Sequence, residues 1–311
     1  MTWTAGAAGT RHLFMTKFTP LSDGFGIEAS GVDLSQPLTA GAFAEIERAF
    51  YAGQVLAIRG QRLTARQFAA FAALFGPPQP HVIDQFHHPE DPNILILSNV
   101  MKDGQPTGLQ DAGSYFHTDY SYLQVPARAT TLYSIVVPKV GGDTMFANQQ
   151  AAYDDLPDAM KRRIEALYGT HHYGNRQDTD ESSRTAASKL TAEQKAKMPL
   201  ITHRIARPHP VTGRKSLYAV SGSSFGIVGM PDDEARGLLD ELAAHSTSAK
   251  YRYSYKYGVG DVVVWDNASL LHSATIIDPN DARTLWRVTM LESSAGAVAP
   301  AVLAPAYAGP M

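Results

Sequence analysis

Residues 115–120 contain a histidine and an aspartate two positions apart, His117 and Asp119. If this segment is a strand, the two side chains share one face, with their Cα atoms roughly 7 Å apart. An imidazole nitrogen and a carboxylate oxygen so placed can bind one metal ion at about 2 Å each. The same pair also occurs by chance in proteins that bind no metal, so the pair alone predicts a metal site only weakly.

A second histidine, His272, follows a hydrophobic run that ends at Trp265 and a short turn. Two histidines and one carboxylate form the facial triad of non-haem Fe(II) oxygenases, which leaves open positions on the metal for a co-substrate and O₂. A histidine that is hydrogen-bonded in the core is the competing interpretation. His272 by itself does not decide between the two.

Eleven residues beyond His272, the run 283–290 has the composition of a strand and contains two arginines. Alternation along a strand puts Arg283, Leu285 and Arg287 on one face. Burying two guanidinium groups is costly unless anions neutralise them, and guanidinium binds carboxylate bidentately. An edge strand with both arginines in solvent would explain the same pattern, so both interpretations stay open.

The elements that would position these residues are mostly strands. From residue 94 onward, strand-like runs outnumber helices and do not alternate with them, which favours an antiparallel sandwich or barrel with flanking helices. Helices are expected around 43–50, after the capping-box pair Thr64 and Gln67, over 157–167, and from Pro231. The expected strands cover residues 54–58, 94–98, 129–137, 216–220, 251–257, 261–265 and 284–291.

A single domain is expected over residues 16–295, because no internal repeat and no shift in composition marks a second one. Residues 1–15 are interpreted as an N-terminal extension and residues 296–311 as a C-terminal tail. The stretch 169–197 is polar and weakly periodic, and an insert of that length is typical of a functional lid or a loop. The run His171-His172-Tyr173, at its start, would reach an acidic substrate if such a lid closed.

The composition limits the partners and the kind of site. The 311 residues have a net charge of −3 and no basic block, so a nucleic-acid partner has little electrostatic support. The chain has no cysteine, so a metal would have to bind histidine, carboxylate or water. The apolar runs have strand length and are too short for a bilayer, so a cytoplasmic protein without a membrane partner is expected.

Further motifs follow one another in order between Thr19 and Met290. They are Gly31-Val-Asp-Leu, Phe75-Gly-Pro, His117-Thr-Asp119, Gly141-Gly-Asp-Thr144, the run from His209 to Tyr218, Gly229-Met-Pro, the run from Gly260 to Asn267, His272, Arg283 and Arg287. This ordered set resembles the taurine dioxygenase / 2,4-dichlorophenoxyacetate dioxygenase family of Fe(II)- and 2-oxoglutarate-dependent enzymes. The resemblance implies a double-stranded β-helix, a jelly-roll or cupin-like core, in agreement with the strand-rich pattern.

The resemblance also implies roles for single residues. His117, Asp119 and His272 match the iron ligands of the family. Thr144 matches a threonine that hydrogen-bonds the distal carboxylate of 2-oxoglutarate. Arg283 matches the arginine that pairs with that same carboxylate.

Two further matches concern the substrate. Arg287 matches the second arginine of the family, which in several members binds the substrate's own acid group. His81 lies where relatives place a substrate-binding histidine. Relatives often have an asparagine shortly before the His-x-Asp pair, whereas residues 111–114 here read Asp-Ala-Gly-Ser. That contact is therefore missing or replaced, and the identity of the substrate is not implied.

The implied reaction uses Fe(II), 2-oxoglutarate and O₂ to hydroxylate a small organic substrate, with succinate and CO₂ as co-products. Arg287 suggests that this substrate is an anion: an aryloxyalkanoate, another carboxylate or a sulfonate. The small molecule is the only partner implied. Assembly into a homo-oligomer, a dimer or a tetramer, stays open.

Two alternatives come from other classes of protein. Ser224 lies in a Gly-x-Ser-x-Gly motif, and Asp266 and His272 follow in the chain order of a serine hydrolase. That motif needs a helix directly after the serine, and the next expected helix begins only at Pro231. A non-catalytic cupin-like binding protein would have the three metal ligands without the arginines, so Arg283 counts against it.

Overall fold

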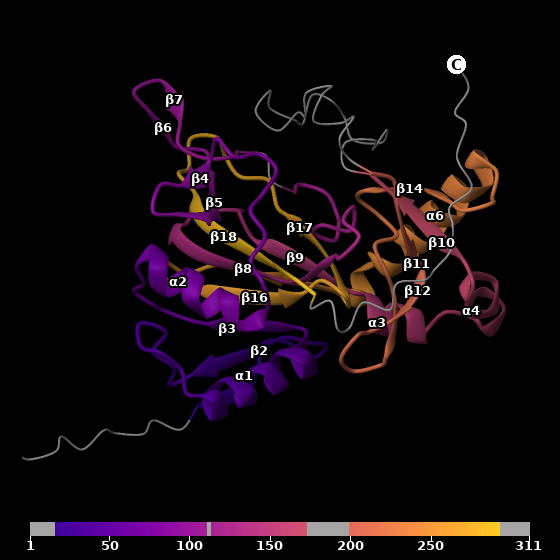
Figure 1. Cartoon of the computed structure of the whole chain (residues 1–311), viewed down its shortest axis with the longest axis horizontal. Coiled ribbons are helices and arrows are strands. Elements are labelled where there is room, and N and C mark those ends of the chain that lie inside the picture. The colour runs from indigo at the N-terminus through magenta and orange to yellow at the C-terminus, as the bar shows by residue number, and fades with distance from the viewer. Residues whose placement is uncertain (1–15, 111–112, 173–198, 293–311) are drawn as a thin grey trace, which may run out of the picture.

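A computed structural model of the chain describes residues 16–110, 113–172 and 199–292. Two sheets lie at its centre, one with eight strands and one with three (Figure 1). The larger sheet has, in spatial order, β1 (Lys17–Pro20), β2 (Ile27–Ser30), β3 (Val55–Ile58), β16 (Val262–Asp266), β8 (Ala127–Val136), β18 (Thr284–Leu291), β5 (Asp91–Ser98) and β4 (His87–His88). The smaller sheet has β15 (Arg252–Tyr255), β9 (Thr144–Asn148) and β17 (Leu270–Ala274).

All pairings in these two sheets are antiparallel except that of β2 with β3. The sheets enclose a shared core, because alternate side chains of each strand point inward. Val263 and Trp265 of β16 join this inner core, together with Phe146 of β9, whereas Val262 and Val264 point outward. The core is the jelly roll, and the prediction of a mainly β fold with flanking helices is confirmed.

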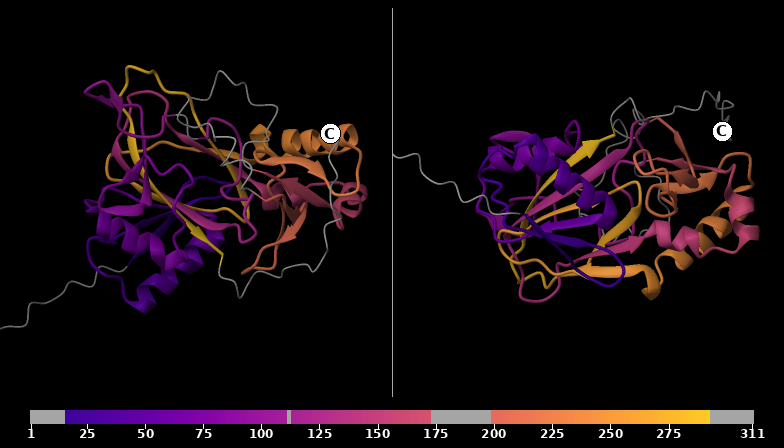
Figure 2. Two further views of the ribbon diagram at one scale, coloured as in Figure 1. Left: turned by 45° about the horizontal axis from the view of Figure 1, so that its top comes forward. Right: turned by 90° about the horizontal axis from the view of Figure 1, so that it is seen from below.

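Two helices cover the outer face of the larger sheet, and Figure 2 shows both on the same side of it. They are α1 (Ala40–Gly53) and α2 (Ala65–Ala72), the latter followed by the 3-10 turn η1 (Ala73–Phe75). The predicted capping box of Thr64 and Gln67 begins α2. Phe50 and Phe68 are completely buried against the sheet, and such burial stabilises by about 1.5–3 kcal/mol for each side chain.

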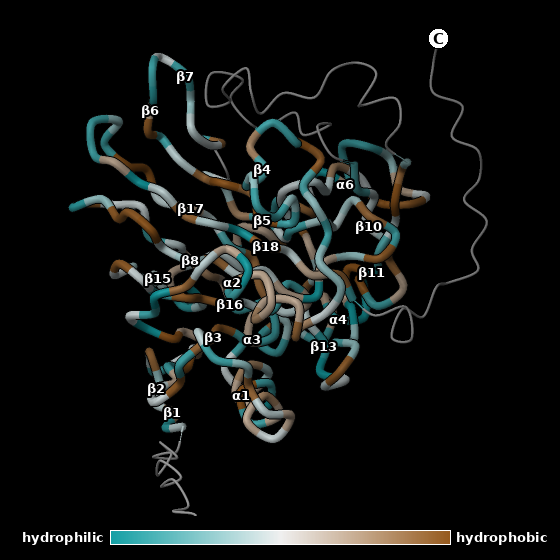
Figure 3. Tube along the Cα trace, turned by 60° about the vertical axis from the view of Figure 1, so that its left-hand side comes forward, coloured by the Kyte–Doolittle hydropathy of each residue, from teal (hydrophilic) through white to brown (hydrophobic). Residues whose placement is uncertain are grey.

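A second group of elements packs beside the jelly roll around its own hydrophobic cluster (Figure 1). Its helices are α3 (Gln149–Asp154), α4 (Asp158–Ile164), α6 (Asp232–Ser246) and the 3-10 turn η4 (Ala249–Tyr251). Its strands are β10 (Tyr168–His171), β11 (Ile201–Arg204), β12 (Ala206–Pro208), β13 (Lys215–Leu217) and β14 (Ser224–Ile227). A short hairpin of β6 (Met101–Lys102) and β7 (Gln105–Pro106) projects from the jelly roll, with a hydrophilic tip in Figure 3.

The helices expected around 43–50, after Thr64, over 157–167 and from Pro231 are all present, although Pro231 caps α6 rather than joining it. The expected strand over 251–257 is shorter at both ends: Tyr251 belongs to η4, and β15 ends at Tyr255. The prediction that His117 and Asp119 lie on a strand is wrong. His117 forms only an isolated bridge, and the chain turns at Asp119, where the next residue has a positive φ of 52°.

Several predictions concern residues outside the described ranges. The N-terminal extension 1–15, the tail 296–311, residues 111–112 and most of the insert 169–197 are among them. The first residues of that insert, 169–172, are described. His171 ends β10 and is buried against the rings of His203 and Tyr218, so it does not face solvent. Within the described part of the chain, none of the helices has the length and apolar character that a bilayer crossing requires.

Candidate metal and co-substrate site

Two histidines from distant parts of the chain are joined by their backbones. His117, in the loop before β8, forms an antiparallel bridge with His272 of β17, and each backbone N–H donates to the other's carbonyl at 2.9 Å. Their ring centroids are 4.2 Å apart. The register of this bridge therefore fixes both side chains on the same side of the sheet.

Glycines on both sides allow this close packing around His117. A Cβ on Gly113 would lie 2.5 Å from His117 Cε1, and one on Gly222 would lie 2.6 Å from His117 Cβ. Both glycines have positive φ, which side chains other than hydrogen rarely adopt. The loop that carries His117 thus depends on the absence of side chains at both positions.

The histidine rings are in the form that binds a metal. The Nδ1–H of His117 donates to the carbonyl of Tyr115 at 2.8 Å, which leaves the Nε2 lone pair available as a ligand. Burial, with a further contribution from His117, lowers the pKa of His272 to about 3, so its ring is neutral at physiological pH. A neutral imidazole is the form that binds a metal.

Asp119 lies between the two rings. One carboxylate oxygen, Oδ1, is 3.6 Å from His117 Nε2, and the other, Oδ2, is 3.5 Å from His272 Nε2. Burial acts to raise the pKa of Asp119, but His272, Arg287 and His117 together hold it well below its usual value. Atoms that each lie about 2 Å from one metal are at most about 4 Å apart. The donor set of His117, Asp119 and His272 therefore fits a metal ion, and the type and number of ligands fit Fe(II).

A buried hydrogen-bond network holds the Asp119 carboxylate in place. Thr130 Oγ1 donates to Asp119 Oδ2 at 2.6 Å, and Asn267 Nδ2 donates to the same Thr130 oxygen at 2.9 Å. The backbone N–H of Asp119 donates to Asn267 Oδ1 at 3.3 Å. Thr130 and Asn267 are completely buried. Since Oδ2 already accepts from Thr130, this network limits how the carboxylate can turn toward a metal.

We expect Thr130→Val to weaken metal binding by roughly 10- to 100-fold, the usual cost of losing a partner of a ligand. The measurement is the melting temperature of each variant as a function of Mn(II) concentration. Thr131→Val is the matched control, because Thr131 is equally buried but on the outer face, and among the described residues its hydroxyl has no hydrogen-bond partner. Equal Mn(II) affinity in the two variants would show that Thr130 does not position Asp119.

A second cluster lies at the start of β18 and contains the residues matched to 2-oxoglutarate. Thr144, at the start of β9, lies opposite Tyr255 in the sheet, and its hydroxyl is 2.9 Å from the phenol oxygen of Tyr257. Arg283 directly precedes β18 and is 8% exposed. Burial lowers the pKa of Arg283, against smaller opposite effects of Tyr257 and Asp143.

The guanidinium of Arg283 makes no ion pair within the described residues, and its Nε has no hydrogen-bond partner there. A guanidinium keeps its charge in proteins, and a buried charge is costly unless an opposite charge is near it. This buried guanidinium therefore suits an anion, and a carboxylate matches its geometry.

Arg287 lies on the same inner face of β18, between β8 and β5, so the alternative of a solvent-exposed edge strand is wrong. Its Nη1 is 3.6 Å from Asp119 Oδ1. Burial lowers the pKa of His81 to about 3, and the charge of Arg287 contributes to this shift. His81 is therefore close enough to Arg287 to be affected by its charge. Its Nδ1 accepts the backbone N–H of Ile83 at 3.1 Å, so the ring proton is on Nε2.

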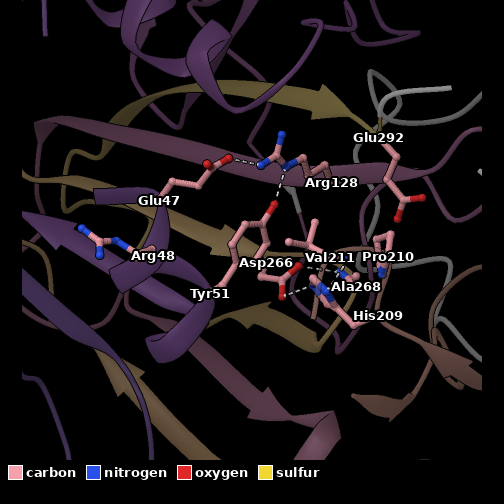
Figure 4. Close-up of a pocket in the computed structure, with 10 residues that line it drawn as sticks. All are labelled: Glu47, Arg48, Tyr51, Arg128, His209, Pro210, Val211, Asp266, Ala268 and Glu292. Carbon is pink, nitrogen blue, oxygen red and sulfur yellow. Dashed lines mark hydrogen bonds and ion pairs between the residues drawn. The ribbon is translucent and has the colours of Figure 1, made fainter. Parts of the chain in front are cut away.

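The residues of the hydrolase alternative do not come together. Ser224 lies in β14, and within the described chain its hydroxyl has no hydrogen-bond partner. Asp266 accepts instead from His209 Nε2 at 2.9 Å, in a separate cavity of about 330 Å³ (Figure 4). His272, the base of that alternative, has its Nε2 3.5 Å from Asp119 Oδ2 instead. The hydrolase interpretation is therefore wrong, and the pair of Asp266 and His209 holds the loop after β12 against β16.

Three residues of the site have no role in the sequence interpretation: Thr130, Asn267 and Tyr257. Asn267 belongs to a quoted motif, and the other two lie in strands that were expected. Thr130 is a polar residue inside an otherwise hydrophobic strand, and this could have marked it as a site residue. The pattern does not reveal that its hydrogen-bond partner is Asp119. Tyr257 carried no signal beyond strand propensity.

A jelly roll that brings two histidines and one carboxylate together defines the class of non-haem Fe(II) oxygenases. Residues 17–289 match the family model described as the taurine catabolism dioxygenase TauD, TfdA family. The chain belongs to this family, and it is an Fe(II)- and 2-oxoglutarate-dependent dioxygenase that uses O₂.

Individual relatives agree with this assignment. The chain is 34% identical to the alpha-ketoglutarate-dependent 2,4-dichlorophenoxyacetate dioxygenase of Cupriavidus pinatubonensis, over 88% of this chain and 97% of that protein. It is 30% identical to an (S)-phenoxypropionate/alpha-ketoglutarate-dioxygenase of Sphingobium herbicidovorans, over 86% and 92%. The crystal structure of AAD-2 in complex with Mn(II) and N-oxalylglycine matches with a TM-score of 0.73 and 30% identity, covering 89% of this chain and 98% of that one.

Proposed function

We propose that this dioxygenase hydroxylates a small organic anion, a carboxylate in the first instance, while 2-oxoglutarate is converted to succinate and CO₂. The observation that carries the anionic substrate is Arg287, a buried guanidinium beside Asp119 on the inner face of β18. A buried cation near the reaction centre favours an anionic ligand. The two relatives described above support a carboxylate, since both are named for aryloxyalkanoates.

In this proposal His117, Asp119 and His272 hold Fe(II), which supplies the oxidative chemistry when it is bound. Arg283 pairs with the distal carboxylate of 2-oxoglutarate, and Thr144 donates a hydrogen bond to it. These two residues orient the co-substrate, so that its keto-acid end faces the three ligands. The buried surroundings of Arg283 exclude water, which strengthens the pairing of the two charges.

The substrate is held by different residues. Arg287 binds its acid group, and His81 donates from Nε2, because its Nδ1 is occupied by a backbone N–H. The distance of 3.6 Å from Arg287 Nη1 to Asp119 Oδ1 also fits a second role. From there Arg287 would instead reach the keto-acid carboxylate of 2-oxoglutarate beside the metal.

The variant Arg287→Ala separates these roles. If Arg287 binds the substrate, we expect the variant to keep nearly normal 2-oxoglutarate turnover without substrate, and to lose at least about 30-fold in hydroxylation. The measurement is succinate release over a panel of carboxylates, sulfonates and their neutral amides. Amides should be poor substrates of the parent enzyme and should lose that disadvantage in the variant. Collapse of turnover without substrate would assign Arg287 to the co-substrate and remove the argument for an anionic substrate.

We further propose that the enzyme acts in the cytoplasm on a free small molecule and has no nucleic-acid partner. The net charge of −3 and the lack of a basic block support this. A domain over residues 16–295 and assembly into a dimer or tetramer are also proposals, and the mass in solution by light scattering tests the second.

A further inference from the structure

Tyr257 contacts the co-substrate cluster and has no role in the function proposed above. Its phenol oxygen lies 2.9 Å from Thr144 Oγ1, well within hydrogen-bond distance. Both side chains are buried, Thr144 at 3% and Tyr257 at 8% exposure. Tyr257 is also close enough to Arg283 for the guanidinium to affect its phenol electrostatically. One tyrosine thus links the two residues proposed to bind the distal carboxylate.

Packing keeps the tyrosine ring in one place. The ring of Tyr255 meets it edge to face, with centroids 5.0 Å apart. Both rings belong to the core between the two sheets, where Phe146 and Trp265 also pack. The phenol oxygen therefore has a fixed position, and a hydrogen bond to it costs little further ordering.

Two hydroxyl groups that share one hydrogen bond keep one proton for another acceptor. Either hydroxyl of this pair could donate. Because a phenol is the more acidic of the two groups, we assign the donor role to Tyr257 and the acceptor role to the threonine oxygen. The hydroxyl proton of Thr144 then has to point elsewhere, and a carboxylate paired with Arg283 is the acceptor that the cluster suits. Without Tyr257, the threonine hydroxyl could turn to other acceptors, and the hydrogen bond to the carboxylate would weaken.

We propose that Tyr257 is a positioning residue of the 2-oxoglutarate site, which fixes the Thr144 hydroxyl as a donor to the distal carboxylate. This inference rests on the proposed roles of Arg283 and Thr144. Tyr257 acts through Thr144, so removing its hydroxyl should affect the binding of 2-oxoglutarate more than the rate at saturation.

The test is Tyr257→Phe, which removes only the hydroxyl group. We expect KM for 2-oxoglutarate to rise roughly 3- to 10-fold, the usual effect of one lost hydrogen bond, while kcat stays within about twofold. Binding of N-oxalylglycine to the Mn(II)-loaded protein, measured by calorimetry, should weaken by the same factor. Tyr255→Phe is the matched control, because its hydroxyl bonds Asp261 at 2.8 Å and not Thr144. It should leave KM unchanged even if it lowers the melting temperature.

A double-mutant cycle with Thr144→Val distinguishes positioning from a general loss of packing. If Tyr257 acts through Thr144, Tyr257→Phe should have no further effect on KM in the Thr144→Val background. Additive effects, or an unchanged KM in the single variant, would overturn the inference. Arg283→Ala reports on the proposed function separately. A raised KM in Arg283→Ala together with a normal one in Tyr257→Phe would reject only the role of Tyr257.

Discussion

Alanine in place of Asp119 is expected to abolish Fe(II)-dependent consumption of 2-oxoglutarate, and alanine at His117 or His272 should do the same. Loss of a residue that merely supports a ligand costs roughly 10- to 100-fold, so loss of a ligand should cost more than about 100-fold. Asp119 is also the only carboxylate of the metal-binding group found in the described residues, and its removal leaves the two imidazoles as the only protein ligands of that group.

The measurement for these variants is succinate release at saturating Fe(II), together with a Mn(II) titration followed by thermal unfolding. The three ligands are polar side chains grouped around one metal position, so we expect the variants to fold and to lose the Mn(II)-dependent rise in melting temperature. His245→Ala is the control, because this histidine lies on α6 and bonds the Ala152 carbonyl. Full activity in any one ligand variant would remove that residue from the proposed set.

The side chains of His117 and Asp119 were predicted from the sequence to lie together, and they do. The physical reason given for this is not the one that the structure shows. Strand alternation was the argument, yet the segment is a loop that makes a single bridge with His272. What brings the three residues together is that bridge and two hydrogen bonds of Asp119: its carboxylate accepts from Thr130, and its backbone N–H donates to Asn267. These contacts span 148 and 11 residues of chain, and no local pattern encodes their register.

The strand β18, which carries Arg287, was easier to predict. Period-two alternation depends only on local geometry, and β18 does place Arg287 on the same inner face as Leu285. Whether that face would be buried was not predictable, since it depends on β5 and β8 packing on either side. The partner of Thr144 shows the same limit, because Tyr257 is 113 residues away and only the pairing of β9 with β15 brings the two hydroxyls together.

Arg283→Ala should raise KM for 2-oxoglutarate at least about 30-fold, because losing one side of a buried charge pair costs about 2 kcal/mol or more. Arg283 suits this role better than other arginines, since it is buried and has no ion pair among the described residues. Arg214→Ala is the control, because Arg214 is half exposed and pairs with Asp154 at the surface. Such a pair contributes about 1 kcal/mol or less to stability and should not affect KM.

Arg283→Lys refines this prediction. Lysine restores the charge but not the planar pair of donors, so it should recover only part of the affinity. Steady-state kinetics with varied 2-oxoglutarate, with and without substrate, measures both variants. In Arg283→Ala, kcat should approach the parent value at high co-substrate if the residue mainly binds, and should stay low if it also orients the keto acid. An unchanged KM in Arg283→Ala would show that another residue holds the distal carboxylate, and full recovery with lysine would show that charge alone is recognised.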